Sequence, residues 1–144
     1  MSQRWPMLFA GLMAVLAGCT PAPGPPPTSQ DSQLTGSIWR VEDINSAGIM
    51  DYAFLTLDFS PDGRVYGDAG CNTYRGSYKL SSDGGILFHG IAVTEKHCEA
   101  EALMAQEQRF LDALASAEHY EYNEFGALVL KGPESKSVLA LPVD

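Results

Sequence analysis

Apolar and polar residues alternate along several segments of the chain, and this period of two limits the possible folds more than any other feature. Within Thr73–Leu80, the side chains of Tyr74, Tyr78 and Leu80 fall on one face, and polar residues and glycine separate them. Residues 55–59 alternate in the same way. Such a rhythm is typical of strands that bury one face. We therefore predict a sheet with one apolar side.

Turn-forming residues separate the predicted strands. Ser60–Gly63 combines proline with glycine, which favours a tight hairpin turn between two strands. Three later segments carry similar signals: Ser82–Gly85, Asn123–Gly126 and Gly132-Pro133. Short spacings of this kind indicate an antiparallel meander. Further apolar positions suit three more strands near the C-terminus: Tyr120, Tyr122, Leu128, Leu130, Val138 and Leu139.

One segment, Glu99 to Ala115, has helical periodicity instead. Its apolar residues recur at intervals of three and four, which places them on one stripe of a helix. Glu99 and Glu101 stand near its start, where they complement the helix dipole. The predicted fold class is α+β: a strongly curved antiparallel sheet with one inserted helix that packs on the sheet or plugs one end.

The N-terminal residues have the layout of a secretory signal. Arg4 precedes an apolar run from Met7 to Leu16, which is shorter than the ~20 residues of a membrane-spanning helix. Leu16-Ala17-Gly18-Cys19 resembles the lipobox of bacterial lipoproteins. The resemblance implies removal of residues 1–18 and lipidation of Cys19. We therefore expect a mature protein that stays on a membrane surface in the cell envelope.

The residue after the lipidated cysteine bears on the destination. Thr20 stands where an aspartate would indicate retention at the inner membrane, so in a Gram-negative cell we expect the periplasmic face of the outer membrane. Residues 19–34 are rich in proline and small polar residues, which predicts an extended linker. A single domain, residues 35–144, should follow. The formal net charge of −9 argues against a nucleic-acid partner.

Cys71 and Cys98 are the cysteines that remain beside Cys19. An even number of thiols in an exported chain favours a disulfide. There are two alternatives. One is a metal site that includes His97, and the other is a pair of buried thiols that stay unbonded. Zinc sites usually show separated ligand pairs with defined spacings, which this segment lacks. We predict the disulfide and no metal.

Glu107 occupies an unusual position on the predicted helix. At about 100° per residue it lies in the middle of the apolar stripe, between Leu103, Leu111 and Leu114. An isolated buried charge is very unfavourable, so a basic side chain, a tyrosine hydroxyl or a backbone N–H should bind this carboxylate. We predict a structural buried carboxylate; a general acid is the functional alternative.

Catalytic motifs do not stand out. His89, His97 and His119 lie near acidic residues, but none accompanies a nucleophile motif. The glycines of residues 63–76 suit turns and bulges, and they do not open a helix as a phosphate loop would. We therefore expect neither catalytic residues nor a bound cofactor.

Several stretches together resemble the META domain family, which includes heat-shock lipoproteins of the HslJ type. These stretches are Gly36–Trp39, Leu55–Tyr78 with its Gly70-Cys71-Asn72 core, Ile91–Cys98, and Gln106-Glu107 followed by Phe110 and Leu114. The resemblance implies a β-rich domain with an inserted helix, similar to the cracked barrel of secretion pilot lipoproteins. Members are linked to envelope stress, antibiotic tolerance or secretion, without a known reaction.

Three classes of function remain at this point, and an enzyme has the least support because no catalytic motif stands out. The first is a non-catalytic envelope lipoprotein that binds another envelope protein in a stress or antibiotic-tolerance role. The second is a pilot or carrier that shelters an acyl chain or an apolar peptide inside the curved sheet. Interiors pack densely, so we expect a filled core, which favours the first. The residues expected inside are Leu55, Leu57, Phe59, Tyr74, Tyr78, Leu103, Phe110 and Leu114.

Overall fold

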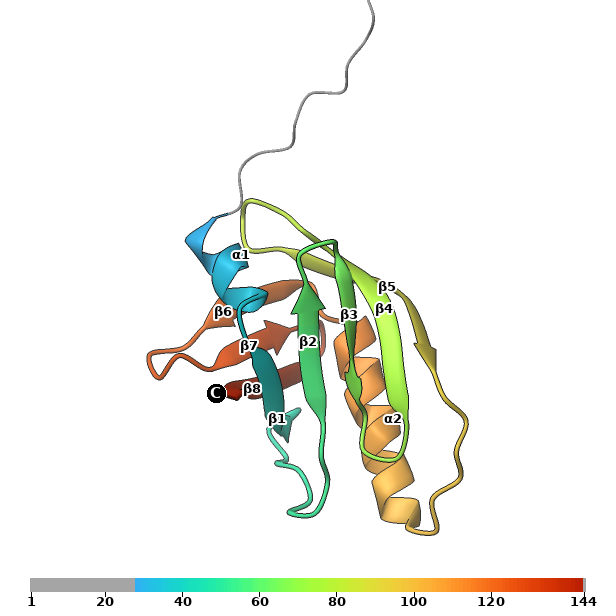
Figure 1. The fold of residues 1–144 in the computed structure, drawn as a ribbon. Helices are drawn as coiled ribbons and strands as arrows, with labels where there is room; N and C mark the ends of the chain where they lie inside the picture. Colours follow the sequence, from blue (N-terminus) through green and yellow to red (C-terminus); the bar gives the residue numbers. More distant parts are fainter. Residues whose placement is uncertain (1–27, 144) are drawn as a thin grey trace, which may run out of the picture.

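The computed structural model describes residues 28–143, which form an antiparallel sheet of eight strands with two helices (Figure 1). The fold class is therefore α+β, as the sequence predicts. The elements are α1 (Ser29–Leu34), β1 (Ile38–Ile44), β2 (Thr56–Ser60), β3 (Arg64–Asp68), β4 (Thr73–Leu80), β5 (Ile86–Val93), α2 (Glu101–Ala115), β6 (His119–Tyr122), β7 (Leu128–Lys131) and β8 (Ser137–Val143).

The sheet consists of two meanders, β1 to β5 and β6 to β8, which are joined where β1 pairs with β8. Its order is β5-β4-β3-β2-β1-β8-β7-β6, and each neighbouring pair is antiparallel. The predicted turn at Ser60–Gly63 is the hairpin between β2 and β3, in which Ser60 pairs with Arg64. A β1–β8 pairing links strands far apart in sequence, and no local signal in the sequence predicts it.

The sheet curls until its two outer strands meet at one end. Gly85 forms a bridge with His119, and the N–H of Tyr120 donates to the carbonyl of Gly84 at 3.0 Å. Beyond this contact the edges separate, and α2, which connects β5 to β6, packs against β5, β8 and β1 (Figure 1). The result is a half-closed barrel whose open side is covered by the inserted helix.

Large apolar side chains fill the inside of the curl. Tyr74 on β4 packs edge-on against Phe110 of α2, with ring centroids 5.7 Å apart, so the helix and the sheet share one core. The side chains with under 2 % exposure include Trp39, Ile44, Leu55, Leu57, Phe59, Val65, Phe110, Leu114, Leu128 and Leu130. The expected interior set is therefore correct except for Leu103. That residue is only half-buried, because it lies in the first turn of α2, where it covers Gly70.

The folded part begins earlier than the sequence predicts. Residues 29–34, which the composition assigned to an extended linker, form α1. Thr28 and Asp31 make a reciprocal capping box at its start, and Leu34 is fully buried. The indole N–H of Trp39 donates to the Leu34 carbonyl at 2.9 Å. The linker prediction is therefore wrong for these residues, because one buried leucine and a tryptophan hydrogen bond attach them to the core.

The signal segment, Cys19 and the proline-rich part of the linker lie outside the described residues. Among residues 28–143, no helix combines the length and the apolar character that a membrane span requires.

Candidate functional site

Glu107 on α2 is buried at 5 % exposure, where the sequence places it. Its Oε2 accepts hydrogen bonds from the backbone N–H groups of Asn72, at 2.6 Å, and Cys71, at 3.1 Å. Its Oε1 accepts a third bond, from Nδ2 of Asn72, at 2.8 Å. The carboxylate thus receives the backbone N–H donors that burial requires.

Asn72 connects this carboxylate to the loop that follows β5. Its Oδ1 accepts from the backbone N–H of Lys96, at 2.7 Å, and from the hydroxyl of Thr94, at 2.8 Å. Its Nδ2 also donates to the Lys96 carbonyl at 3.3 Å. Because an asparagine amide carries both donors and acceptors, this one buried side chain bonds to two segments at once.

A disulfide between Cys71 and Cys98 closes the same corner, with the two Cα atoms 6.1 Å apart. The predicted pairing is confirmed. Within residues 28–143, no cluster of three or more histidine, cysteine or carboxylate side chains could hold a metal ion. His97 is exposed beside the disulfide. The bond fixes the loop between β5 and α2 onto the β3–β4 connection.

These contacts make the corner a structural junction of three segments: the β3–β4 connection, the loop after β5, and α2. Both oxygens of Glu107 already accept bonds from groups of the chain itself. The Glu107 carboxylate therefore serves as a hydrogen-bond acceptor that holds the backbone of Cys71 and Asn72 in place. Asn72 belongs to the Gly70-Cys71-Asn72 core of the sequence, but no local pattern predicts its hydrogen bonds to Glu107 and Lys96.

A second polar cluster lies at the opposite end of the sheet, where α1 meets β6. The hydroxyl of Tyr120 donates to Oδ1 of Asp31 at 2.6 Å, and Tyr122 donates to the Gln30 carbonyl at 3.1 Å. The Tyr120 hydrogen bond lowers the pKa of Asp31. Burial, together with the charge of Asp31, raises the pKa of Tyr122 to about 12. Sequence reasoning missed this cluster, although the Thr28-x-x-Asp31 spacing is a capping-box signal.

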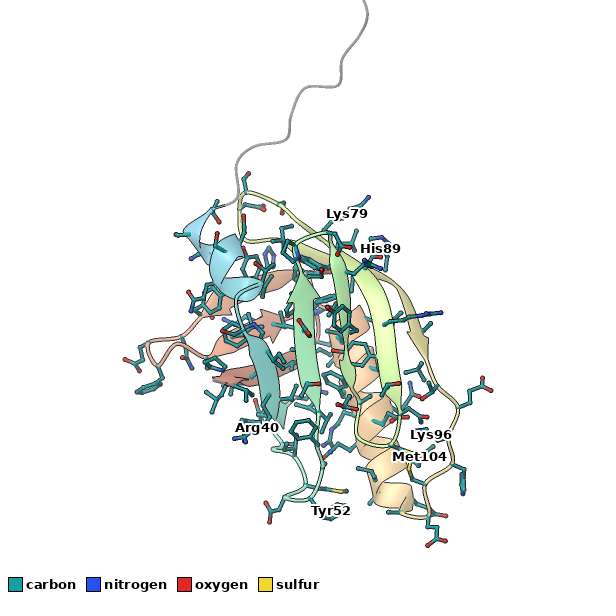
Figure 2. All side chains as sticks on the ribbon, in the orientation of Figure 1. Arg40, Tyr52, Lys79, His89, Lys96 and Met104 are labelled. Carbon is teal, nitrogen blue, oxygen red and sulfur yellow. A yellow bond between two sulfur atoms is a disulfide. The ribbon has the colours of Figure 1, made fainter. Side chains whose placement is uncertain are left out.

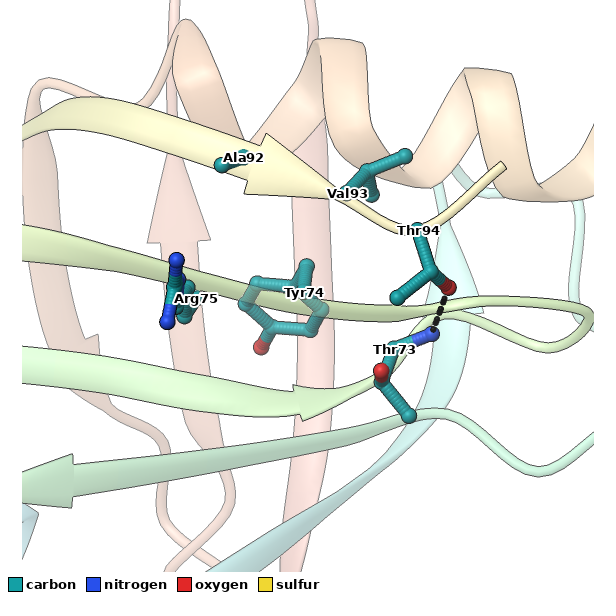
Figure 3. Close-up of a pocket in the computed structure, with 6 residues that line it drawn as sticks. All are labelled: Thr73, Tyr74, Arg75, Ala92, Val93 and Thr94. Carbon is teal, nitrogen blue, oxygen red and sulfur yellow. Dashed lines mark hydrogen bonds between the residues drawn. The ribbon is translucent and has the colours of Figure 1, made fainter. Parts of the chain in front are cut away.

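The described pockets are open hollows on the surface. One lies beside the disulfide corner, where Thr73 to Arg75 of β4 run next to Ala92 to Thr94 at the end of β5 (Figure 3). The N–H of Thr73 donates to the Thr94 hydroxyl across it at 3.2 Å. A larger one, about 480 Å³, lies between the outer face of β1 and the loop after it.

The three histidines are dispersed. His89 lies on β5, His97 on the loop before α2, and His119 at the start of β6, and all three are exposed. The structure therefore does not bring them together with Glu107. Gln106 is a buried residue that sequence reasoning missed: its Oε1 accepts from the backbone N–H of Met50 at 2.9 Å.

Solved structures share this fold at low sequence identity. The NMR structure of a protein from Burkholderia xenovorans is 21 % identical, with a TM-score of 0.62 over 86 % of this chain and 94 % of that one. A second NMR structure is 20 % identical, with a TM-score of 0.61 over 76 % and 91 % of the two chains. A crystal structure of a DUF4847 family protein from Bacteroides vulgatus is 14 % identical, with a TM-score of 0.57 over 81 % and 98 %.

No curated protein matches the sequence significantly. The model of the META domain family, in contrast, matches residues 32–143, which cover almost all of the described fold. This match includes the Gly70-Cys71-Asn72 segment and Glu107, the residues of the junction. The chain therefore belongs to the META domain family.

Proposed function

We propose that this protein is an envelope lipoprotein, held on a membrane by lipid chains on Cys19, whose META domain binds another envelope protein and performs no catalysis. The lipobox-like Leu16–Cys19 segment supports the anchor. In a Gram-negative host the domain would face the periplasm from the outer membrane. The family's links to envelope stress and antibiotic tolerance support a role in those responses.

The filled interior of the curled sheet is the observation that carries the proposal. Trp39, Phe59 and Phe110 point into the curl at 0–1 % exposure, so side chains occupy the space that a sheltered acyl chain would need. Packing at this density leaves the outer surface as the part that can interact. Binding through the surface fits a protein partner better than it fits the carriage of lipid.

The state of Glu107 supports a non-catalytic role. A general acid or base must reach a substrate proton within hydrogen-bonding distance. Here the carboxylate is 5 % exposed, and its partners are the backbone of Cys71 and Asn72 and the side-chain amide of Asn72. The one buried carboxylate that the sequence singles out therefore serves the fold.

In-cell crosslinking of the mature lipoprotein, followed by mass spectrometry, tests the proposal. We expect one envelope protein to be enriched with the wild type and to be lost with Cys19→Ser, which removes the anchor. Native mass spectrometry of the purified protein tests the carrier function. A fatty acid or phospholipid retained in stoichiometric amount, without an enriched protein, would contradict the proposal.

A further inference from the structure

The loop between β1 and β2 exposes two aromatic side chains at one end of the domain. Tyr52 is 70 % exposed and Phe54 is 55 % exposed, and Figure 2 shows Tyr52 at the end of the molecule opposite α1. Isolated exposed apolar residues are common, but here two exposed aromatic residues stand two positions apart in one loop. Ile49, Met50 and Ala53, all half-buried, lie beside them.

Hydrogen bonds hold this loop in place. The N–H of Met50 donates to Oε1 of Gln106 on α2 at 2.9 Å, and the N–H of Ala53 donates to the Met50 carbonyl at 2.9 Å. At the start of the loop, the N–H of Gly48 donates to Oδ2 of Asp43 at 2.7 Å. The aromatic side chains therefore project from a fixed turn, so binding through them loses little conformational entropy.

A hollow of about 480 Å³ adjoins Phe54. Its lining joins Ile49–Asp51, Ala53 and Phe54 to Arg40 and Glu42 on the outer face of β1. Arg40 donates from Nε to Oε1 of Glu42 at 2.6 Å, and Asp51 is exposed at the rim. We call Ile49–Phe54 with Arg40 and Glu42 the distal surface. It combines two exposed aromatic side chains with two carboxylates and one guanidinium, so its formal charge is −1.

The distal surface lies at the far end of the sheet from the point where the chain enters the domain. Thr28 precedes α1, β1 runs away from α1, and the distal surface follows the end of β1 (Figure 1). The seven residues of β1 alone cover about 23 Å at ~3.3 Å per residue. Eight residues, 20–27, separate Cys19 from Thr28 and reach at most about 29 Å.

That geometry directs the distal surface away from the bilayer. To touch the membrane, the eight residues would have to run almost fully extended back along the domain. Aromatic side chains on a fixed turn are, in contrast, typical anchors of protein interfaces.

We infer that the distal surface is the docking site for the partner, an envelope protein that presents an apolar groove with basic residues at its rim. The groove receives Tyr52 and Phe54, and a basic side chain of the partner pairs with Asp51 at the rim of the hollow. This inference rests on the proposed function, because the tether to Cys19 defines which end of the domain is distal. The net charge of −9 agrees with a basic partner surface.

The test places a photoreactive benzoylphenylalanine at position 52 or 54 of the full-length lipoprotein in its host. Position 125 is the matched control, because Phe125 is also aromatic and is more exposed, at 82 %, but lies on the β6–β7 turn. We expect irradiation to link positions 52 and 54 to one and the same protein, and position 125 to leave it unlinked. Mass spectrometry identifies the adduct.

Binding of the purified lipoprotein in nanodiscs to the identified protein completes the test. Phe54→Ser should weaken binding roughly tenfold or more, as loss of a central aromatic anchor does. Phe125→Ser should change it less than about twofold, and added salt should weaken binding if the groove has a basic rim. Adducts with lipid or with a second copy of this chain at positions 52 and 54 would overturn the inference.

A comparison of the general in-cell crosslinking with the site-specific crosslinking at positions 52 and 54 distinguishes the distal surface from the proposed function. If an envelope protein is enriched with the whole lipoprotein but positions 52 and 54 give no adduct with it, the distal surface is wrong and the proposed function stands. If no envelope protein is captured by either method, both are wrong.

Discussion

Glu107 and Asn72 are joined by two hydrogen bonds across a separation of 35 residues, one from the backbone N–H at 2.6 Å and one from the side-chain amide at 2.8 Å. The pair connects α2 to the β3–β4 connection, and Asn72 extends the connection to Lys96. Hydrogen bonds to a buried carboxylate are stronger than those between neutral groups. This pair is therefore a principal contact between the inserted helix and the sheet.

Glu107→Gln should lower the free energy of unfolding by about 1–3 kcal/mol, because a glutamine amide cannot accept at both oxygen positions. Its amino group would face a donor, either Nδ2 or the backbone N–H of Asn72. Urea unfolding measures the change. Glu124→Gln, at an exposed turn, is the control and should shift the value by less than about 0.5 kcal/mol. A double-mutant cycle with Asn72→Ala should give a coupling of ~0.5–3 kcal/mol; additive effects would contradict this pairing.

Removal of the disulfide should lower stability without unfolding the domain. The bridge spans 27 residues in sequence, for which loop-closure entropy gives about 3–4 kcal/mol. Asn72 still bonds to Lys96 and Glu107 when the bridge is absent, so the Cys71→Ala/Cys98→Ala variant should still fold and should melt at a lower temperature. Thiol labelling of the unreduced, denatured wild type should detect neither Cys71 nor Cys98; two labelled thiols would disprove the bond.

Acid should remove the contribution of Asp31 to stability. The Tyr120 hydroxyl lowers the pKa of Asp31 in the folded state, so the ionised form stabilises the fold above the unfolded pKa of ~3.9. This stabilisation is lost as the pH falls through the lower folded pKa. Tyr120→Phe should therefore melt below the wild type at neutral pH, and the gap should narrow under acid conditions. If the difference in melting temperature between Tyr120→Phe and the wild type does not change with pH, the ionisation of Asp31 does not cause it.

Gly67→Ala should be strongly destabilising. A Cβ at Gly67 would lie 2.1 Å from the backbone oxygen of Thr56 on the neighbouring strand, and a backbone atom cannot move aside as a flexible side chain can. Overpacking of this kind costs about 1–3 kcal/mol or more. Thermal unfolding measures it. Gly48→Asn is the comparison, because no atom lies within 4 Å of that Cβ and asparagine tolerates its φ of +64°. An equal loss in both would refute the steric explanation.

Cys19→Ser should release the protein from the membrane fraction. A serine has no thiol to acylate, and the lipid chains are the proposed source of membrane affinity. Fractionation and the mass of the mature chain are the readouts. If the variant still sediments with membranes at the mature mass, the proposed anchor is wrong. Thr20→Ser, which keeps Cys19, should behave as the wild type.

Period and composition were sufficient to predict much of the domain. The alternation in Thr73–Leu80 predicts β4 because a strand points every second side chain toward the core. Tyr74 and Tyr78 are buried accordingly. The helical stripe places Glu107 toward the sheet for the same local reason. The disulfide follows from the number of cysteines. The strand and the helical stripe depend on neighbours within a few residues, and the disulfide prediction depends on the two cysteines that remain beside Cys19.

The tertiary structure decided the features that depend on distant partners. Composition assigned residues 29–34 to a linker, yet Leu34 is buried and Trp39 bonds to its carbonyl, which a local pattern does not show. Asn72 becomes the hydrogen-bond partner of Glu107 only because the fold brings it next to α2. The sequence itself determined strands such as β4 and the helix α2, because those elements are set by side-chain periodicity. Only the curled sheet determined which buried polar groups meet and which aromatic side chains are left outside, because both depend on closure of the sheet around α2.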